Sequence, residues 1–242
     1  MKQVNAIYDT SGNDGYKDDR KSLVQAGIDT PEKLTEALLA IKAMTGDSPK
    51  QIRDRAIISA SLRLNNVDKR FGYFPTPKAL VSELIFLANI KEGMKVLEPS
   101  AGKGDIAEAI RAISNVSVDV CELGHAQCEV LKLKGFAILN NDFMELTPVE
   151  MYDRVVMNPP FTTPYDKACD ETHIIHAWKF LKRGGRLVAI ASAAVLFRSD
   201  YQSFRNWIES IDGTITKNPD GSFKDSDRPT GVSTVTIVLN KI

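Results

Sequence analysis

The chain has 242 residues, enough for one α/β domain with a substantial core and a small additional lobe. Lysine plus arginine and aspartate plus glutamate each number 31, so the net charge gives no argument for a polyanionic partner, although a local patch can still bind one. The three cysteines form no CxxC pair, which is typical of reduced thiols in a cytoplasmic protein. The chain starts with polar residues, so no signal peptide is expected. No apolar run approaches the ~20 residues of a membrane span, so no membrane contact is expected either.

The first part of the chain is expected to contain a loosely ordered segment and then a small helical lobe. Residues 1–20 are polar and rich in turn-forming residues. Residues 21–70 contain two helical patterns, the second of which begins at a capping box formed by Ser48 and Gln51. Seven basic residues against two acidic ones around the second pattern predict either a phosphate-contacting surface or a solvated helix face. The basic residues are Lys50, Arg53, Arg55, Arg63, Lys69, Arg70 and Lys78.

A segment rich in aromatic residues and proline opens the α/β domain that we predict for residues 71–242. It ends in Phe74-Pro-Thr-Pro77 and precedes a helical pattern. Thr76 is expected to cap that helix, with Pro77 at its first position. This arrangement places aromatic rings and unpaired N–H groups just before the first strand. The alternative is an aromatic plug in the core, where the two parts of the chain meet.

Strand and helix patterns alternate through the rest of the chain. Strands are predicted near residues 94–97, 117–121, 136–139, 154–157, 186–191, 212–217 and 234–239, and helices near 104–114, 124–134, 171–182 and 200–209. This alternation is typical of a Rossmann-like seven-stranded, mostly parallel sheet with helices on both faces. No helix separates the last two strands, so we expect the last strand to be antiparallel. The polar loop 218–233 between them is predicted to leave the carboxyl edge of the sheet, as a substrate lid or as an irregular loop.

A tight turn of small residues follows the first predicted strand. Its sequence is Glu98-Pro-Ser-Ala-Gly-Lys-Gly104, and Ala107 stands where the third glycine of a dinucleotide fingerprint would fall. Small residues let backbone N–H groups approach a ligand, and the following helix adds positive potential at its N-terminus. Taken alone, this turn is equally typical of an ordinary connection between a strand and a helix.

Residues at the ends of the next two strands strengthen the case for a ligand site. Glu122 ends the second strand 18 residues after Gly104, where a carboxylate can accept hydrogen bonds from ribose hydroxyls. Asp142 follows the third strand and can accept from an adenine amino group, while Phe143 can stack on the adenine ring. With the glycine turn, these residues describe a pocket for an adenosine-bearing cofactor.

The tetrapeptide Asn158-Pro159-Pro160-Phe161, at the end of the fourth strand, is the most specific motif of the chain. The two prolines remove two N–H donors and fix the backbone. The Asn158 side-chain oxygen and the Pro159 carbonyl can then accept from one planar amino group, which makes its nitrogen a better nucleophile without a strong base. Phe161 can stack on a flipped-out base. The alternative is a proline-rich turn that ends a buried strand.

With these motifs in place, residues 71–242 resemble a class I S-adenosylmethionine-dependent methyltransferase, and most closely the N6-adenine (amino-group) DNA methyltransferases. The similar motifs are the entry segment from Phe74 to Pro77, the loop from Glu98 to Gly104 and the unchanged Asn-Pro-Pro-Phe motif. Only 81 residues follow Phe161, and the predicted strands use them, so no separate recognition domain fits. The resemblance therefore implies relaxed specificity, a specificity subunit or a homodimer, in a compact enzyme of the kind that suits a phage or mobile element.

The resemblance also implies roles for individual residues. It implies that S-adenosylmethionine is the cofactor, that Thr76 contacts its methionine part and that Glu122 binds its ribose. It implies further that Asp142 and Phe143 bind its adenine. The predicted cofactor-binding residues are Phe74, Thr76, Pro77, Glu98, Pro99, Ser100, Ala101, Gly102, Gly104, Glu122, Asp142, Phe143 and Asn158. The predicted catalytic residues are Asn158, Pro159, Pro160 and Phe161, acting on DNA rather than RNA.

Three other functions are compatible with the same motifs. A protein glutamine methyltransferase of the release-factor type also has a helical lobe and an Asn-Pro-Pro tetrapeptide, but usually ends it in tyrosine; Phe161 and Glu98-Pro99 favour nucleic acid. RNA adenine methylation is a second alternative, which the motif does not exclude. A catalytically silent protein that binds S-adenosylmethionine would keep the pocket without turnover, and the intact tetrapeptide argues against it.

Cys169, His173 and His176 form the one candidate metal site in the sequence. Their spacing places them on one face of a predicted helix, as metal ligands require. No fourth ligand is evident nearby, so we predict a structural helix and no metal.

Overall fold

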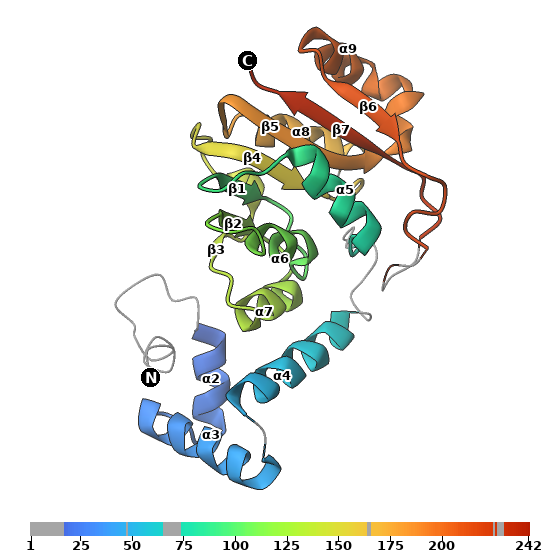
Figure 1. Cartoon of the computed structure of the whole chain (residues 1–242). Helices are drawn as coiled ribbons and strands as arrows, with labels where there is room; N and C mark the ends of the chain where they lie inside the picture. The colour runs from blue at the N-terminus through green and yellow to red at the C-terminus, as the bar shows by residue number, and fades with distance from the viewer. Residues whose placement is uncertain (1–16, 47, 65–73, 164–165, 225, 227–229) are drawn as a thin grey trace. The chain divides into compact units, whose positions relative to one another are not determined.

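The computed structural model describes residues 17–46, 48–64, 74–163, 166–224, 226 and 230–242. The chain divides into two compact units, Met1–Ala56 and Ile57–Ile242. The sheet lies in the larger unit (Figure 1). The domain boundary predicted at residue 70 falls outside the described residues and stays a prediction.

The smaller unit is helical. It contains α2 (Lys17–Gln25), α3 (Pro31–Thr45) and the first half of α4 (Pro49–Arg63). The capping box is confirmed, because the Gln51 N–H donates to Ser48 Oγ at 3.3 Å and the Ser48 N–H donates to Gln51 Oε1 at 2.8 Å. The loose segment predicted for residues 1–20 lies mostly outside the described residues, but it is wrong from Lys17 onward, where α2 begins.

The larger unit contains the seven predicted strands and the helices between them. The strands are β1 (Lys95–Glu98), β2 (Ser117–Cys121), β3 (Ile138–Asn140), β4 (Tyr152–Met157), β5 (Leu181–Ser192), β6 (Thr214–Lys217) and β7 (Thr234–Asn240). The helices are α5 (Lys78–Ala88), α6 (Asp105–Arg111), α7 (His125–Leu133), α8 (Cys169–Trp178) and α9 (Gln202–Ser210), with short 3-10 turns η3 (Phe143–Glu145), η4 (Ala193–Leu196) and η5 (Ser199–Tyr201). The second half of α4 also belongs to this unit, which begins at Ile57. Its buried residue Ala60 and Leu64, the residue after the helix, pack against Val130 of α7.

The sheet order is β3-β2-β1-β4-β5-β7-β6. β1 pairs in parallel with β2 and β4, β3 with β2, and β5 with β4, whereas β7 is antiparallel to both β5 and β6. The Rossmann-like prediction and its antiparallel last strand are therefore confirmed. The strand order reverses between β1 and β4, which is where ligands bind in open α/β sheets.

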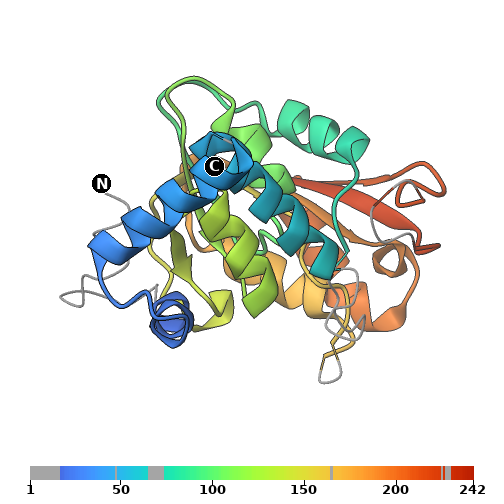
Figure 2. The ribbon, with the colours of Figure 1, turned by 90° about the horizontal axis from the view of Figure 1, so that it is seen from below.

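Both faces of the sheet are covered by helices, because successive strand residues point to opposite sides. Val96 and Val156 pack on the side of α5 and α6, whereas their neighbours Leu97 and Val155 pack on the side of α8. Figure 2 shows α5 on one side of the strands and the orange helices α8 and α9 on the other. The carboxyl edge between these layers is left to loops.

Several predicted boundaries are wrong: the strand predicted at 186–191 begins at Leu181, the strand predicted at 212–217 begins at Thr214, and the helix predicted at 104–114 ends at Arg111. Two further differences have a visible cause. Phe136 is buried in the turn after α7, and its N–H donates to the Leu131 carbonyl. The strand β3 therefore begins at Ile138, two residues later than expected. The predicted helix 171–182 is shorter, because Leu181 already pairs with Tyr152 as part of β5.

The loop between β6 and β7 leaves the carboxyl edge of the sheet, as predicted, because β6 runs parallel to β5. Its first residues are packed: Phe223 is buried, and Asn218 Nδ2 donates to Thr234 Oγ1 at 2.9 Å. Residues 225 and 227–229 lie outside the described residues, and the role of a substrate lid stays a prediction.

Candidate functional site

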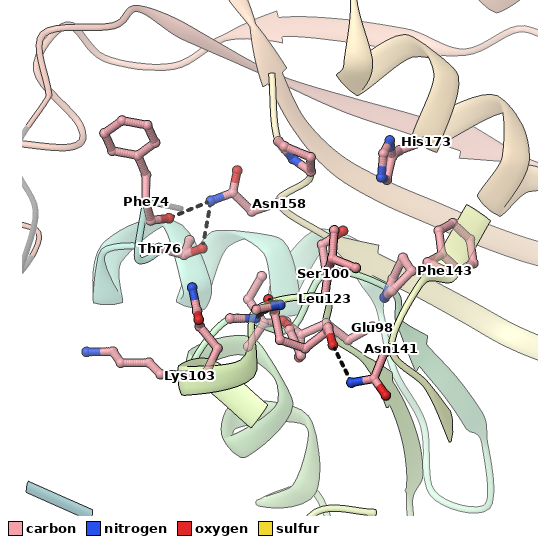
Figure 3. Close-up of a pocket in the computed structure, with 18 of the residues that line it drawn as sticks. Phe74, Thr76, Glu98, Ser100, Lys103, Leu123, Asn141, Phe143, Asn158 and His173 are labelled. Atoms are coloured by element: carbon pink, nitrogen blue, oxygen red, sulfur yellow. Dashed lines mark hydrogen bonds between the residues drawn. The ribbon is translucent and has the colours of Figure 1, made fainter. Parts of the chain in front are cut away.

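A cavity of about 580 Å³ lies at the carboxyl ends of β1 to β4 (Figure 3). It brings together the segment before α5, the turns after these four strands and the start of α8. The predicted site residues that line it are Phe74, Thr76, Glu98, Pro99, Ser100, Ala101, Gly102, Glu122, Asp142, Phe143, Asn158 and Pro160. Four predicted residues, Pro77, Gly104, Pro159 and Phe161, are not part of its lining.

Glu122 is held in place by the backbone of two turns. The Gly102 N–H donates to its Oε2 and the Gly124 N–H donates to its Oε1, each at 2.7 Å. Burial raises the pKa of this carboxyl, and the two hydrogen bonds oppose that shift without cancelling it. Each carboxylate oxygen retains a lone pair for a second donor, as ribose hydroxyls would supply.

The glycine turn works differently from the prediction. The Gly102 N–H is used by Glu122, and the Gly104 N–H donates to the Ala101 carbonyl at 2.8 Å. The predicted role of these two N–H groups as donors to a ligand is therefore wrong. Gly104 is required for its φ of +92° and for packing, since a Cβ there would lie 2.9 Å from the Leu131 Cδ2.

Glu98 is a buried acceptor without a partner. Only 1% of it is exposed, and its Oε2 has no hydrogen-bond partner among the residues that the structure describes. Burial, together with the charges of Asp105 and Glu122, raises the pKa of Glu98 well above its ordinary value. A cationic ligand group in the cavity would satisfy this oxygen, so Glu98 fits the ammonium of an amino-acid moiety.

The turn after β3 positions Asp142 and Phe143. Asp142 Oδ1 accepts from the Met144 N–H at 2.8 Å and caps η3. Phe143 lines the cavity but is only 3% exposed, because its ring packs against His176 and Phe180 with centroids 4.8 and 5.3 Å apart. Its main contacts are thus with the core, and stacking on adenine stays a prediction.

Asn158 is bound to the segment before α5. Its Nδ2 donates to the Phe74 carbonyl at 3.2 Å and to Thr76 Oγ1 at 3.0 Å (Figure 3). Its Oδ1 is buried and accepts no hydrogen bond from any described residue. The prediction that Thr76 caps α5 is wrong: the N-cap is Pro77, without a side-chain cap, and Thr76 contacts Asn158 instead.

The other residues of the tetrapeptide support the loop after β4. Pro159 is buried, whereas Pro160 lines the cavity. Phe161 is partly buried against the apolar cluster that contains Phe223, and its carbonyl accepts from the Cys169 N–H at 3.2 Å. Its stacking on a base would take place outside this cavity, and stays a prediction.

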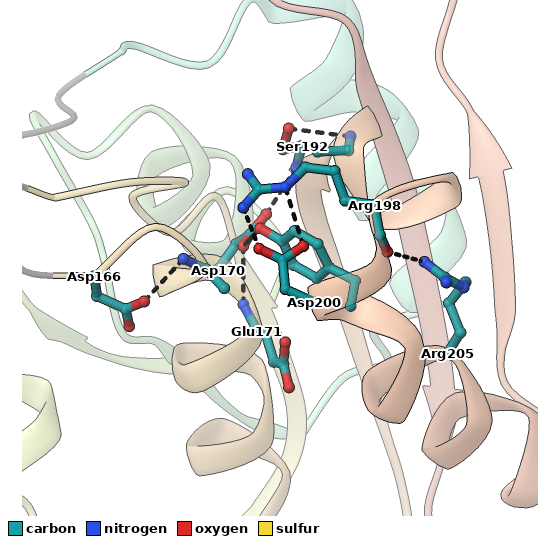
Figure 4. A network of polar contacts seen from close by, with 10 residues as sticks. Asp166, Asp170, Glu171, Ser192, Arg198, Asp200 and Arg205 are labelled. Atoms are coloured by element: carbon teal, nitrogen blue, oxygen red, sulfur yellow. Dashed lines mark hydrogen bonds and ion pairs between the residues drawn. The ribbon is translucent and has the colours of Figure 1, made fainter.

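α8 is fixed beside the cavity by Asp170, which is fully buried (Figure 4). The Tyr201 hydroxyl donates to Asp170 Oδ1 at 2.6 Å, and the Ser192 N–H donates to Oδ2 at 2.9 Å. Burial raises the pKa of Asp170, while these hydrogen bonds favour the charged form. The end of β5 and η5 are thereby tied to the first turn of α8.

Of the lining residues that were not predicted as part of the site, Leu123 and His173 bear most on ligand binding. Leu123 is 71% exposed although it is apolar, and the available signal was its place directly after Glu122. The sequence suggested His173 only as a metal ligand. Its Nδ1 lies 2.8 Å from the Cys169 carbonyl oxygen, and burial lowers the pKa of its imidazole.

Across the described ranges, no group of three or more His, Cys, Asp or Glu side chains could hold a metal ion. In the same ranges, no helix is long and apolar enough to cross a bilayer.

Comparisons with known proteins agree with this arrangement. A family model described as "Methyltransferase small domain" matches residues 80–208, which is more than half of the chain. No curated protein sequence matches the chain. Among solved structures, a proposed class I S-adenosylmethionine-dependent methyltransferase from Listeria monocytogenes is similar with a TM-score of 0.64 and 15% identity, over 92% of this chain and 78% of that one.

Two further structures show the same fold. A modification subunit of a proposed type I restriction enzyme from Vibrio vulnificus has a TM-score of 0.59 and 16% identity, over 81% of this chain and 50% of that one. A proposed RNA methyltransferase from Pyrococcus horikoshii has a TM-score of 0.52 and 22% identity, over 72% and 91%. The match thus spans half of the Vibrio subunit and most of the Pyrococcus protein.

Proposed function

Because this chain belongs to the methyltransferase small domain family, with S-adenosylmethionine as its cofactor, we propose that it methylates an exocyclic amino group, namely N6 of adenine in DNA. The observation that carries the proposal is the state of the Asn158 side chain. Its two donor protons are used within the protein, while its buried oxygen accepts from none of the described residues. An amino group of a substrate is the donor that would complete this site.

The cavity offers a suitable group for each part of the cofactor. Glu98 would accept from the ammonium, and Glu122 would accept from the ribose hydroxyls. Leu123 and Asp142 would contact the adenine, one by apolar packing and the other by a hydrogen bond. When bound, the cofactor supplies an electrophilic methyl group on a sulfonium sulfur.

Asn158 would prepare the substrate nitrogen for attack. The Oδ1 would accept one amino proton, and the Pro159 carbonyl is proposed to accept the other. These hydrogen bonds draw the nitrogen out of conjugation with the ring and towards a tetrahedral lone pair. They also orient that lone pair, and positioning of this kind can supply much of the rate enhancement. After transfer the nitrogen is cationic and acidic, so water can take its proton and no basic side chain is needed.

Target recognition in this proposal depends on a partner or is relaxed. Most of the described residues after Phe161 belong to the sheet and to the helices that cover it. The Vibrio protein of similar fold is described as a modification subunit of a restriction enzyme, and this chain spans half of its length. We therefore propose a specificity subunit or a second copy as the partner for DNA.

The test is methyl transfer from radiolabelled S-adenosylmethionine to duplex DNA, single-stranded DNA, RNA and a protein extract in parallel. We expect label in DNA, and a rate of labelling lower by about 10²–10³ when Asn158 is replaced by alanine. Label in RNA or on glutamine of a protein would reassign the substrate. Cofactor binding without transfer to any substrate, with and without candidate partner subunits, would contradict the proposal.

A further inference from the structure

The orientation of the Asn158 carboxamide decides whether the site can accept a substrate amino group. The two ends of a carboxamide have nearly the same shape, but one end donates two protons and the other only accepts. With its oxygen towards the substrate, Asn158 complements an amino group. With its NH2 towards the substrate, it would place donor against donor, and the same residue would oppose binding.

The neighbours of Asn158 Nδ2 select the first orientation. The Phe74 carbonyl can only accept, so it requires the NH2 group at 3.2 Å. Thr76 Oγ1 accepts the second proton at 3.0 Å. A rotated amide would leave two oxygens facing each other at Phe74 and two donors facing each other at the substrate.

Building on the proposed function, we propose that Thr76 is a positioning residue that acts through Asn158. Its hydroxyl, together with the Phe74 carbonyl, holds the carboxamide so that Oδ1 is presented to the target amino group. This role differs from the cofactor contact that the resemblance implies for Thr76. It also explains why Thr76 does not cap α5, since the same oxygen is used by a residue 82 positions later.

The flanking prolines make Thr76 suited to this role. Pro75 and Pro77 are both buried, and each fixes its own φ angle. Pro77 has φ −60° and ψ 146°, and its carbonyl accepts from the Val81 N–H at 2.9 Å, which joins the segment to α5. Leu80, Val81 and Leu84 anchor that helix in the core. The Thr76 hydroxyl is therefore held by a segment with little freedom.

The test compares Thr76→Val, which keeps the shape but removes the hydroxyl, with Thr76→Ser, which restores it. Thr216→Val is the matched control, because Thr216 is exposed on the edge strand β6. We expect roughly tenfold lower kcat for Thr76→Val, as the loss of one such hydrogen bond implies, with a cofactor Kd within about twofold of wild type. Thr76→Ser should recover most of the rate. Unchanged kcat, or a loss confined to cofactor affinity, would overturn the proposal.

A second readout does not depend on turnover. The side-chain amide protons of Asn158, assigned by their absence in Asn158→Ala, should exchange slowly with solvent in the wild type and faster in Thr76→Val. Equal exchange in both proteins would overturn the positioning role. If this difference is seen while the wild type methylates no amino group, the positioning role stands and the proposed function fails.

Discussion

Replacing Asn158 by alanine should separate activity from stability. The substitution removes the only side-chain acceptor proposed for the target amino group. Removing one preorganised polar group from a water-excluded site typically lowers kcat by about 10²–10³, or roughly 3–4 kcal/mol, and we expect a loss of this size. The reacting atoms would otherwise be unchanged, so cofactor affinity should remain within about threefold, which is well under 1 kcal/mol.

The effect of Asn158→Ala on the free energy of unfolding should be much smaller, because two contributions to it oppose each other. Alanine leaves the Phe74 carbonyl and Thr76 Oγ1 without their donor, which costs about 1–3 kcal/mol. It also removes the buried Oδ1, whose missing partner costs a similar amount in the wild type. We therefore expect the free energy of unfolding to change by no more than about 1 kcal/mol.

Asn158→Asp is the informative comparison. Aspartate keeps one oxygen towards the substrate but places a second oxygen where Nδ2 donates to the Phe74 carbonyl. Two acceptors then face each other, so this variant should be less stable than Asn158→Ala, although it keeps an acceptor for the target amino group and should be the more active of the two. Single-turnover methyl transfer, calorimetric titration of the cofactor and urea unfolding would measure the three quantities. A rate for Asn158→Ala within about threefold of wild type would show that Asn158 is not the acceptor of the target amino group.

Three further predictions concern cofactor binding and the hydrogen bonds that hold α8 beside the cavity. Because Glu98 has a raised pKa in the free protein and binds a cation as the carboxylate, cofactor affinity should fall as the pH drops through that raised pKa. Calorimetry should find a weaker dependence in Glu98→Gln, where Glu122 alone still titrates, and an identical dependence would exclude Glu98 as a source. Leu123→Ser should weaken cofactor binding by about tenfold, because apolar surface buried against the cofactor is lost. Leu139 is exposed on β3 outside the cavity, so Leu139→Ser should leave cofactor affinity unchanged, and equal effects of the two substitutions would contradict a contact between Leu123 and the cofactor. Asp170→Asn should lower the free energy of unfolding by about 1–3 kcal/mol, because its NH2 group would face a backbone N–H in either orientation, that of Ser192 or that of Glu171. Urea unfolding equal to that of the wild type would show that the network is dispensable.

The fold was predictable because its signals are local. Alternating apolar runs and helical patterns gave all seven strands, and the missing helix before the last strand gave its antiparallel direction. The site was predictable at the level of strand ends, since parallel strands bring their carboxyl ends to one edge. Glu98, Glu122 and Asn158 accordingly line one cavity.

The exact contacts depended on residues far apart in the sequence. Thr76 before a helix is indistinguishable from an N-cap until Asn158 is placed beside it. The N–H of Gly102 is typical of a ligand donor until Glu122 is seen to accept from it. Phe143 has the pattern of an exposed stacking residue, but the rings of α8 bury it. In each case a long-range contact used a group that local reasoning had assigned to a ligand or to a cap.

The most direct test of the central claim is the identity of the methylated product. Duplex DNA would be incubated with the wild-type protein and S-adenosylmethionine carrying a deuterated methyl group, then digested to nucleosides and analysed by mass spectrometry. We expect the label on N6-methyladenine, at a rate that falls by about 10²–10³ in Asn158→Ala. Label on a ring carbon, such as C5 of cytosine, would contradict it, because the acceptor of Asn158 has no role at an atom without an amino group.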